Sequence, residues 1–292
     1  MIGDTLSERV RDYAPATVIE QESVLQELLQ HFVLASLSRA GFFSVGGFHG
    51  GTCLRILYGT GRFSEDLDFI LKEPATDFRW GPFLEQVRSD CEVDGIRFEV
   101  QERPRSDTAV NKAFLKTDSI GQILVLDLPF VRERPRKIRI RLEIDVNPPL
   151  GSRFETRYIT FPLTAAITTQ TLESGFATKS HALLCRGYTK GRDWYDLLWY
   201  VGKKTIPDFH LLANALEQQG PWAGTRLDVT PGWYLEALRT RIREIDWDAA
   251  RHDVRRFIRS NEQESIDLWN ADLFLFHVDR LGEQILRPGK ES

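Results

Sequence analysis

The sequence predicts an α+β protein, with a mixed or antiparallel sheet and flanking helices in its N-terminal half and a helical domain after it. Short β-type apolar runs recur up to about residue 161. Beyond residue 172, apolar residues recur every three or four positions instead. The change falls within 162–172, so we expect one domain over 1–165, which carries the sheet, and a helical domain over 166–292.

The composition is that of an ordinary globular protein. Of 292 residues, 42% are hydrophobic and 27% charged, which excludes a disordered or collagen-like chain. Three cysteines without a C-x-x-C pair argue against a disulfide framework and a cysteine zinc site, and favour a reducing cytoplasm. No stretch approaches the ~20 apolar residues of a membrane span, and the N-terminus lacks the apolar core of a signal peptide. We therefore expect a cytoplasmic protein that neither crosses a membrane nor is exported.

The elements follow in order. The periodicity predicts a first helix over 19–40, which Gly41 ends. Strands are expected over six runs: 42–45, 66–71, 96–100, 122–131, 137–146 and 157–161. Helices are expected over six later segments: 173–186, 193–202, 208–219, 232–244, 248–259 and 264–286.

A glycine-rich turn before a short helix pattern predicts a phosphate site. Gly46, Gly47, Gly50 and Gly51 allow the backbone to approach a ligand without a Cβ clash, and Thr52 begins the apolar-periodic run. A helix N-terminus offers N–H groups and positive dipole to phosphate. Glycine pairs are also common in ordinary turns, so this pattern is not specific by itself.

Two aspartates on the second strand predict a metal site. Asp66 and Asp68 alternate with apolar residues, so both carboxylates lie on one face of the strand. Hard oxygen ligands suit Mg²⁺, which substrate phosphates and waters then complete. A solvent-facing strand with incidental acids explains D-x-D alone equally well.

The strand expected over 137–146 ends its polar face in Glu143 and Asp145. If that end lies beside Asp66 and Asp68, the carboxylates converge as in a two-metal phosphoryl- or nucleotidyl-transfer site. An edge strand whose charges discourage aggregation has the same alternation.

Two basic clusters stand out against a formal net charge of -4. Residues 132–141 contain six cationic residues, and 239–259 contain seven arginines diluted by acids. The second is typical of a solvated helix face with i,i+4 pairs. The first is a candidate contact for nucleic-acid phosphates.

Several motifs, in order, resemble those of the AbiE-type (AbiEii/AbiGii) abortive-infection nucleotidyltransferase toxins. Gly-Gly-Thr at 50–52 followed by LRILYGTGRFSEDLDF resembles that family's first block. The E-I-D of 143–145, KSHALLCR at 179–186 and KGRDWYDL at 190–197 resemble its later motifs. The family's first motif is usually glycine-serine, whereas this chain has Gly51-Thr52, which keeps the hydroxyl.

The resemblance implies a DNA polymerase β-like nucleotidyltransferase fold, with a sheet that carries the metal ligands and a helical part that closes over the nucleotide. It implies a nucleoside triphosphate substrate and Mg²⁺, which we expect as two ions, with Mn²⁺ as a substitute. It also implies an RNA acceptor such as a tRNA 3′ end and a cognate antitoxin.

Residue roles follow from carrying the motifs over. We expect Asp66, Asp68 and Asp145 to bind metal, with Glu143 as a further candidate. The expected nucleotide contacts are Gly50, Gly51, Thr52, Arg55, Ser64 and Lys179.

In the helical half, Lys179 and Asp193 are the expected catalytic residues, with Asp196 and Lys190 as further candidates. A snorkelling Lys179 and a helix-capping Asp193 are the structural alternatives. Asp196 is expected to pair with Lys190 or Arg192. Histidine spacing gives no zinc motif.

The function expected is therefore a Mg²⁺-dependent nucleotidyltransferase, the toxin of a toxin–antitoxin system, that transfers NMP from an NTP to RNA. Transfer to a protein or a small molecule is the first alternative. A non-catalytic protein that binds nucleotide or antitoxin is the second.

Overall fold

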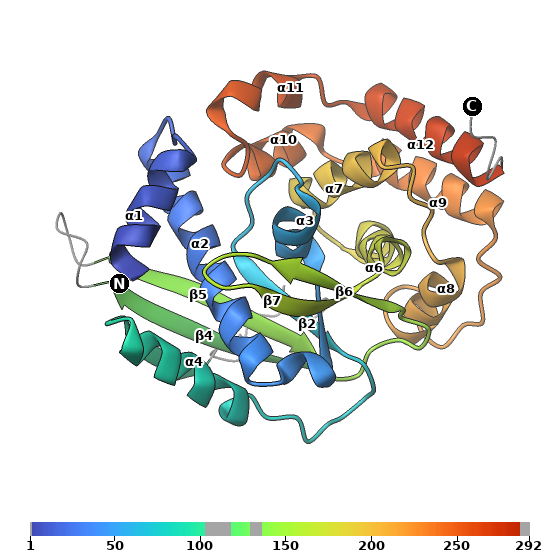
Figure 1. Cartoon of the computed structure of the whole chain (residues 1–292). Helices are drawn as coiled ribbons and strands as arrows, with labels where there is room; N and C mark the ends of the chain where they lie inside the picture. The colour runs from blue at the N-terminus through green and yellow to red at the C-terminus, as the bar shows by residue number, and fades with distance from the viewer. Residues whose placement is uncertain (1, 103–117, 129–135, 287–292) are drawn as a thin grey trace, which may run out of the picture. The chain divides into compact units, whose positions relative to one another are not determined.

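The computed structural model describes residues 2–102, 118–128 and 136–286 (Figure 1). It divides into two compact units. Unit 1 comprises Met1–Pro148 and Phe154–Thr169, and unit 2 comprises Pro149–Arg153 and Gln170–Ser292. The fold is a mixed α/β architecture, as the sequence predicts.

Unit 1 contains a seven-stranded mixed sheet of order β3-β4-β5-β2-β1-β7-β6. The strands are β1 (Gly46–His49), β2 (Asp66–Leu71), β3 (Arg97–Glu102), β4 (Ser119–Leu128), β5 (Arg136–Asp145), β6 (Phe154–Ile159) and β7 (Ala165–Gln170). The described helices are α1 (Ile2–Asp12), α2 (Val18–Arg39), α3 (Gly50–Tyr58) and α4 (Gly81–Val93). Helix α2 packs against α4 and β5, whereas α3 packs against β1, β2 and β6.

Strand β2 matches the expected 66–71 and is held on both sides. It pairs antiparallel with β1 and parallel with β5, and β5 pairs in turn with β4 over ten residues. Leu67 and Phe69 are buried in the core beneath the sheet. Strand β5 therefore lies beside the D-x-D strand, an adjacency that the sequence left open.

The strand expected over 42–45 is wrong, because Phe42–Ser44 is a 3-10 helix and the strand begins at Gly46. Phe42 is fully buried, stacks on Trp80 at 5.3 Å and meets Phe69 edge-on. Its ring lies 2.6 Å from where a Cβ on Gly46 would stand. The glycines of β1 therefore make room for aromatic rings, since Gly47 has the same relation to Phe154 at 2.5 Å.

The interval 162–172 contains a strand that the periodicity did not predict. Strand β7 pairs in parallel with β1 through Thr169 and Phe48. It is a short polar segment, AAITTQ, without the alternation that marks a half-buried strand. Helices α1 and α4 were not predicted either, and β6 begins at Phe154, three residues before the expected start.

Unit 2 is helical. Its helices are α6 (Leu172–Cys185), α7 (Gly191–Gly202), α8 (Phe209–Gln218), α9 (Pro231–Glu244), α10 (Trp247–Arg255), the 3-10 turn Ser260–Glu262, α11 (Glu264–Asp267) and α12 (Ala271–Leu286). The single helix expected over 264–286 is divided in two. Asn270 accepts the N–H of Leu273 at 2.9 Å, so α12 has its own N-terminal cap.

Helix α6 is central to unit 2 and contacts α7, α8 and α9. The start of α7 lies so close to α10 that a Cβ on Gly191 would stand 2.0 Å from the carbonyl of Ala250. Only glycine permits that approach. The region 239–259 contains ion pairs at i,i+3 spacing, such as Arg239–Glu236 at 3.6 Å, in place of the expected i,i+4 pairs, and Arg241 and Arg251 donate to backbone carbonyls, so the region is not simply a solvated face. None of the described helices combines the length and the apolar character that a membrane crossing requires.

Candidate active site

Strand β2 presents two carboxylates on one face of the sheet in unit 1. Asp66 and Asp68 are half-buried, whereas Leu67 and Phe69 between and after them are inaccessible to solvent. The alternation of a strand explains this division, because successive side chains leave opposite faces. The face with the two carboxylates is the one available for chemistry.

The register of β5 decides which carboxylate is their neighbour. Asp68 pairs with Glu143 and Asp66 with Arg141, so these side chains share a face. Asp145 lies one pleat further, opposite Ile70. Asp145 is 7% exposed, and its Oδ1 accepts the N–H of Asn147 at 3.1 Å.

The turn from β1 into α3 lies against Asp68. His49 pairs with Asp68 across the two strands and immediately precedes α3. Gly50 has φ +79°, and a Cβ there would stand 2.7 Å from Oδ2 of Asp68. A glycine is required at this position for both reasons. The Asp68 carboxylate thus lies at the N-terminus of α3, where the helix dipole favours negative charge.

Thr52 and Gly51 have partners other than those expected from the sequence. Thr52 is fully buried, and its hydroxyl donates a hydrogen bond to the carbonyl of Asp66. The Arg62 guanidinium occupies the place of a Gly51 side chain, 2.3 Å from its ideal Cβ position. The threonine therefore ties α3 to the start of β2, and its contact with phosphate stays a prediction.

Arg55 and Ser64 frame the segment before β2. Arg55 forms an ion pair with the buried Glu27 at 2.7 Å and lies over the ring of Phe63. Ser64 is half-buried, and its carbonyl accepts a hydrogen bond from Gln30 at 3.1 Å. Nucleotide contacts by Arg55 and Ser64 stay predictions.

Basic side chains continue from the carboxylates along the same face of β5. Lys137, Arg139 and Arg141 are exposed and stand two residues apart, on the face that Glu143 shares. Arg141 forms an ion pair with Asp66 at 3.7 Å. The pair is open to solvent and contributes little to stability. Residues 132–135 of the predicted basic cluster lie outside the described part of the chain.

The donor set suits a hard divalent ion. Among the described residues, no three histidine, cysteine or acidic side chains form a ready-made metal cage. Mg²⁺ does not require one, because one or two carboxylates with waters and phosphate oxygens are its usual ligands. Two adjacent aspartates beside a glycine turn fit that requirement.

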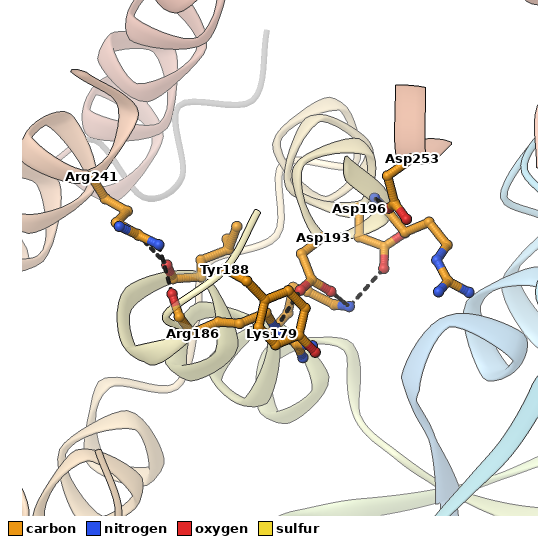
Figure 2. Close-up of polar contacts among 9 residues, drawn as sticks. Lys179, Arg186, Tyr188, Asp193, Asp196, Arg241 and Asp253 are labelled. Carbon is orange, nitrogen blue, oxygen red and sulfur yellow. Dashed lines mark hydrogen bonds and ion pairs between the residues drawn. The ribbon is translucent and has the colours of Figure 1, made fainter. Parts of the chain in front are cut away.

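Unit 2 holds a separate cluster centred on Lys179. Its ammonium lies 2.7 Å from Oδ1 of Asp193 and 2.8 Å from Oδ2 of Asp196. Figure 2 shows the lysine between the two acids. Both carboxylates are almost completely buried. Lys179 is therefore not a snorkelling surface lysine. Asp193 lies within the first turn of α7, after the N-cap residue Lys190, so it is not the helix cap.

Two more cations act on Asp193. Burial alone would raise the pKa of Asp193, but Lys179, Arg186 and Lys190 outweigh it and hold that pKa well below its usual value. Arg186 is an ion-pair partner at 3.2 Å. Burial lowers the pKa of Lys190, which Asp193 partly offsets. Three cations thus act on Asp193, and one of them, Lys179, also contacts Asp196.

Arg241 supports this cluster from α9, whereas the sequence placed it on a solvated helix face within the run 239–259. Arg241 donates to the carbonyl of Arg186 at 2.6 Å and to that of Leu183 at 3.4 Å, at the C-terminal end of α6 (Figure 2). A cation there satisfies terminal carbonyls and favours the helix dipole. Arg241, Arg186 and Lys190 also line a small pocket together with Tyr188.

Comparison with known proteins agrees with this chemistry. The family model described as "Nucleotidyl transferase AbiEii toxin, Type IV TA system" matches residues 33–275. A crystal structure of a "putative nucleotidyltransferase" from H. pylori aligns over 90% of this chain and 94% of its own, with 16% identity and a TM-score of 0.52. JHP933 from Helicobacter pylori aligns over 90% and 91%, with 16% identity and a TM-score of 0.49. No curated protein matches.

The family match covers most of the chain, including the D-x-D strand of unit 1 and the lysine cluster of unit 2. The likeness to the first H. pylori structure supports the fold independently. The chain belongs to the AbiEii family of nucleotidyltransferase toxins of type IV toxin–antitoxin systems.

Proposed function

We propose that this nucleotidyltransferase is Mg²⁺-dependent and transfers NMP from an NTP to an RNA acceptor such as a tRNA, as a toxin that a cognate antitoxin restrains. The observation that carries the proposal is the placement of Asp66 and Asp68 on one face beside Glu143, at the glycine turn into α3. An in-line transfer of a nucleotidyl group requires charge neutralisation and positioning more than a covalent protein intermediate.

The residues then take the following roles. Asp66 and Asp68 hold the metal, which supplies charge stabilisation at the reacting phosphoryl group. Glu143 is the third carboxylate in our assignment, because it adjoins Asp68, whereas Asp145 is one pleat away and bound to Asn147. Mn²⁺ has the same preference for carboxylate and water ligands and is expected to substitute.

The lysine cluster is proposed to contact the triphosphate. The basic side chains of the cluster (Lys179, Arg186, Lys190 and Arg241) outnumber Asp193 and Asp196, and this excess of positive charge favours an anion. The aspartates fix the direction of the Lys179 ammonium through two short contacts. A positioned charge of this kind is effective because it needs no reorganisation when the reaction occurs.

An RNA acceptor is favoured by Lys137, Arg139 and Arg141. They form an exposed row of positive charge that begins beside the metal carboxylates and runs along β5. A polyanionic acceptor releases counterions at such a row, whereas a small-molecule acceptor does not. The affinity for the acceptor should therefore fall steeply as the salt concentration rises. In a plot of log affinity against log salt concentration, Arg139→Gln should make the slope shallower by about one.

The experiment that tests the proposal is labelling with each α-³²P-NTP, Mg²⁺ and total tRNA, with Asp68→Ala in parallel. Loss of charge stabilisation worth several kcal/mol should slow transfer by more than about 100-fold. Label on RNA that is absent with the variant or with EDTA supports the proposal. Label on protein favours a protein acceptor. Label on neither RNA nor protein favours a small-molecule acceptor. Full activity of Asp68→Ala refutes the metal assignment.

A further inference from the structure

Two glutamines of α2 hold the backbone that leads into the D-x-D strand. Gln30 Nε2 donates hydrogen bonds to the carbonyls of Ser64 and Glu65, at 3.1 and 2.9 Å. Gln26 Nε2, one helical turn earlier, donates to the same Glu65 carbonyl at 2.9 Å. It also lies 3.4 Å from the carbonyl of Arg139 in β5. The pair therefore joins one helix to two neighbouring strands of the sheet.

Further donors hold the residues on either side. Arg55 donates to the carbonyls of Thr60 and Gly61, at 3.0 Å each, while Glu27 holds its guanidinium. At the other end, the hydroxyl of Thr52 donates to the carbonyl of Asp66. Side chains of α2 and α3 thus fix this segment through its carbonyl oxygens.

Gln30 is unusual for its position. It is fully buried on a helix whose other buried positions are mostly apolar, and its Oε1 has no hydrogen-bond partner among the described residues. A buried amide with an unsatisfied oxygen destabilises a fold compared with an apolar side chain of the same shape. Stability alone therefore does not explain a glutamine here. Both of its Nε2 contacts are directed at the segment before Asp66.

We propose that Gln26 and Gln30 are positioning residues for nucleotidyl transfer. They fix the carbonyls of Ser64 and Glu65, and with them the direction in which Asp66 and Asp68 leave the sheet. This inference rests on the proposed function, in which these two carboxylates hold the metal. Neither glutamine contacts substrate in this role.

The magnitude follows from the sensitivity of metal-assisted transfer to geometry. Methionine has nearly the length of glutamine but no donor, so Gln30→Met removes two hydrogen bonds without opening a large cavity. Substitution of a group that orients a metal ligand typically lowers metal affinity or activity by about 10–100-fold. A misplacement of about 1 Å at the reacting centre has an effect of the same order.

The experiment compares Gln30→Met and Gln26→Met with Gln21→Met. Gln21 is a matched control on the same helix that makes none of the hydrogen bonds to the segment before Asp66. For each protein we measure kcat, the KM for NTP, the Mg²⁺ concentration for half-maximal rate, Mn²⁺ binding by electron paramagnetic resonance, and amide hydrogen exchange of residues 60–68. We expect Gln30→Met to lower kcat by about 10–100-fold and to raise the half-saturating Mg²⁺ concentration. Exchange over 60–68 should become faster in Gln30→Met but not in Gln21→Met.

The proposal is overturned if Gln30→Met matches Gln21→Met in rate, in metal response and in exchange, whatever its melting temperature. A lower melting temperature with unchanged kcat and Mg²⁺ response also overturns it, since the role would then be structural. If the wild-type protein transfers no label at all, the proposed function fails. The positioning role of Gln26 and Gln30 is then tested by the amide hydrogen exchange of residues 60–68 and by the affinity for Mn²⁺. Faster exchange with weaker Mn²⁺ binding then supports it, and any other result refutes it.

Discussion

Gly50 and Gly59 stand at the two ends of α3 and allow steric strain to be separated from function. Both have positive φ, +79° and +72°. A Cβ on Gly59 meets nothing within 4 Å, whereas one on Gly50 stands 2.7 Å from Oδ2 of Asp68. The substitutions Gly50→Ala and Gly59→Ala therefore add the same kind of backbone strain, but only the first displaces Asp68, a carboxylate that we propose to hold the metal.

The two substitutions should have similar effects on the free energy of unfolding but different effects on kcat. A left-handed conformation costs an alanine about 1–2 kcal/mol, so both variants should unfold more easily by that amount. For a domain of 150–250 residues, 1 kcal/mol corresponds to a change of about 2–4 °C in Tm. Movement of the Asp68 carboxylate by about 1 Å should in addition lower kcat about 100-fold in Gly50→Ala.

The assay is the rate of label transfer from α-³²P-NTP, measured at saturating Mg²⁺ and at a temperature well below both melting points. Thermal unfolding of the two variants gives the strain separately. Equal kcat values for Gly50→Ala and Gly59→Ala would refute the placement of Asp68 at the reaction centre. Loss of folding in Gly50→Ala alone would show that the contact is structural.

Three further outcomes are expected. Glu143→Gln should lower kcat by at least ~100-fold and Asp145→Asn by less than ~10-fold, where each tenfold change in rate corresponds to about 1.36 kcal/mol. The reverse order of rates would restore Asp145 as the third carboxylate. Because the pKa of Asp193 is depressed in the folded state, its stabilising charge is fully present above the ordinary value near 3.8 and is lost as pH falls below it. The free energy of unfolding should accordingly rise between about pH 2 and 5 more steeply in wild type than in Asp193→Asn, as denaturant titrations at each pH will reveal. Burial raises the pKa of each of the three thiols to about 12, so none should react with Ellman's reagent at pH 8 until guanidinium unfolds the protein, and rapid native labelling would contradict that burial.

Much of the sheet was predictable because its central strands have clear two-residue alternation. DLDFIL matched β2 without error, and the long alternating run over 137–146 matched β5 within one residue at each end. The strands that were missed or shifted lack that pattern. In β1, two glycines make room for the rings of Phe42 and Phe154, and β7 is mostly small and polar. Such strands are specified by what packs on them and not by their own residues.

The chemistry-bearing types were also predictable, but their partners were not. The resemblance of residues 179–186 and 190–197 to the family's motifs pointed to Lys179, Asp193 and Asp196, yet only the packing of α6 against α7 reveals that the lysine lies between both acids. Gln26 and Gln30 were overlooked because helical periodicity counts apolar positions. A polar side chain on the buried face of an apolar helix is the observation that would have identified them, since buried polar groups require partners.

The choice between Glu143 and Asp145 illustrates where sequence patterns end. The two residues are two positions apart, so both point to the same face of β5, and alternation alone cannot separate them. A shift of β5 by two residues would place Asp145 opposite Asp68 and Glu143 opposite Asp66, and would leave every apolar residue facing the core. What prevents that shift is the ladder with β4 over ten residues and the tie from Gln26 to Glu65 and to Arg139 in β5. The same glutamine to which we assign the positioning of Asp66 and Asp68 therefore also helps to fix which carboxylate lies beside Asp68, and a two-residue slip in register would transfer the role proposed for Glu143 to Asp145.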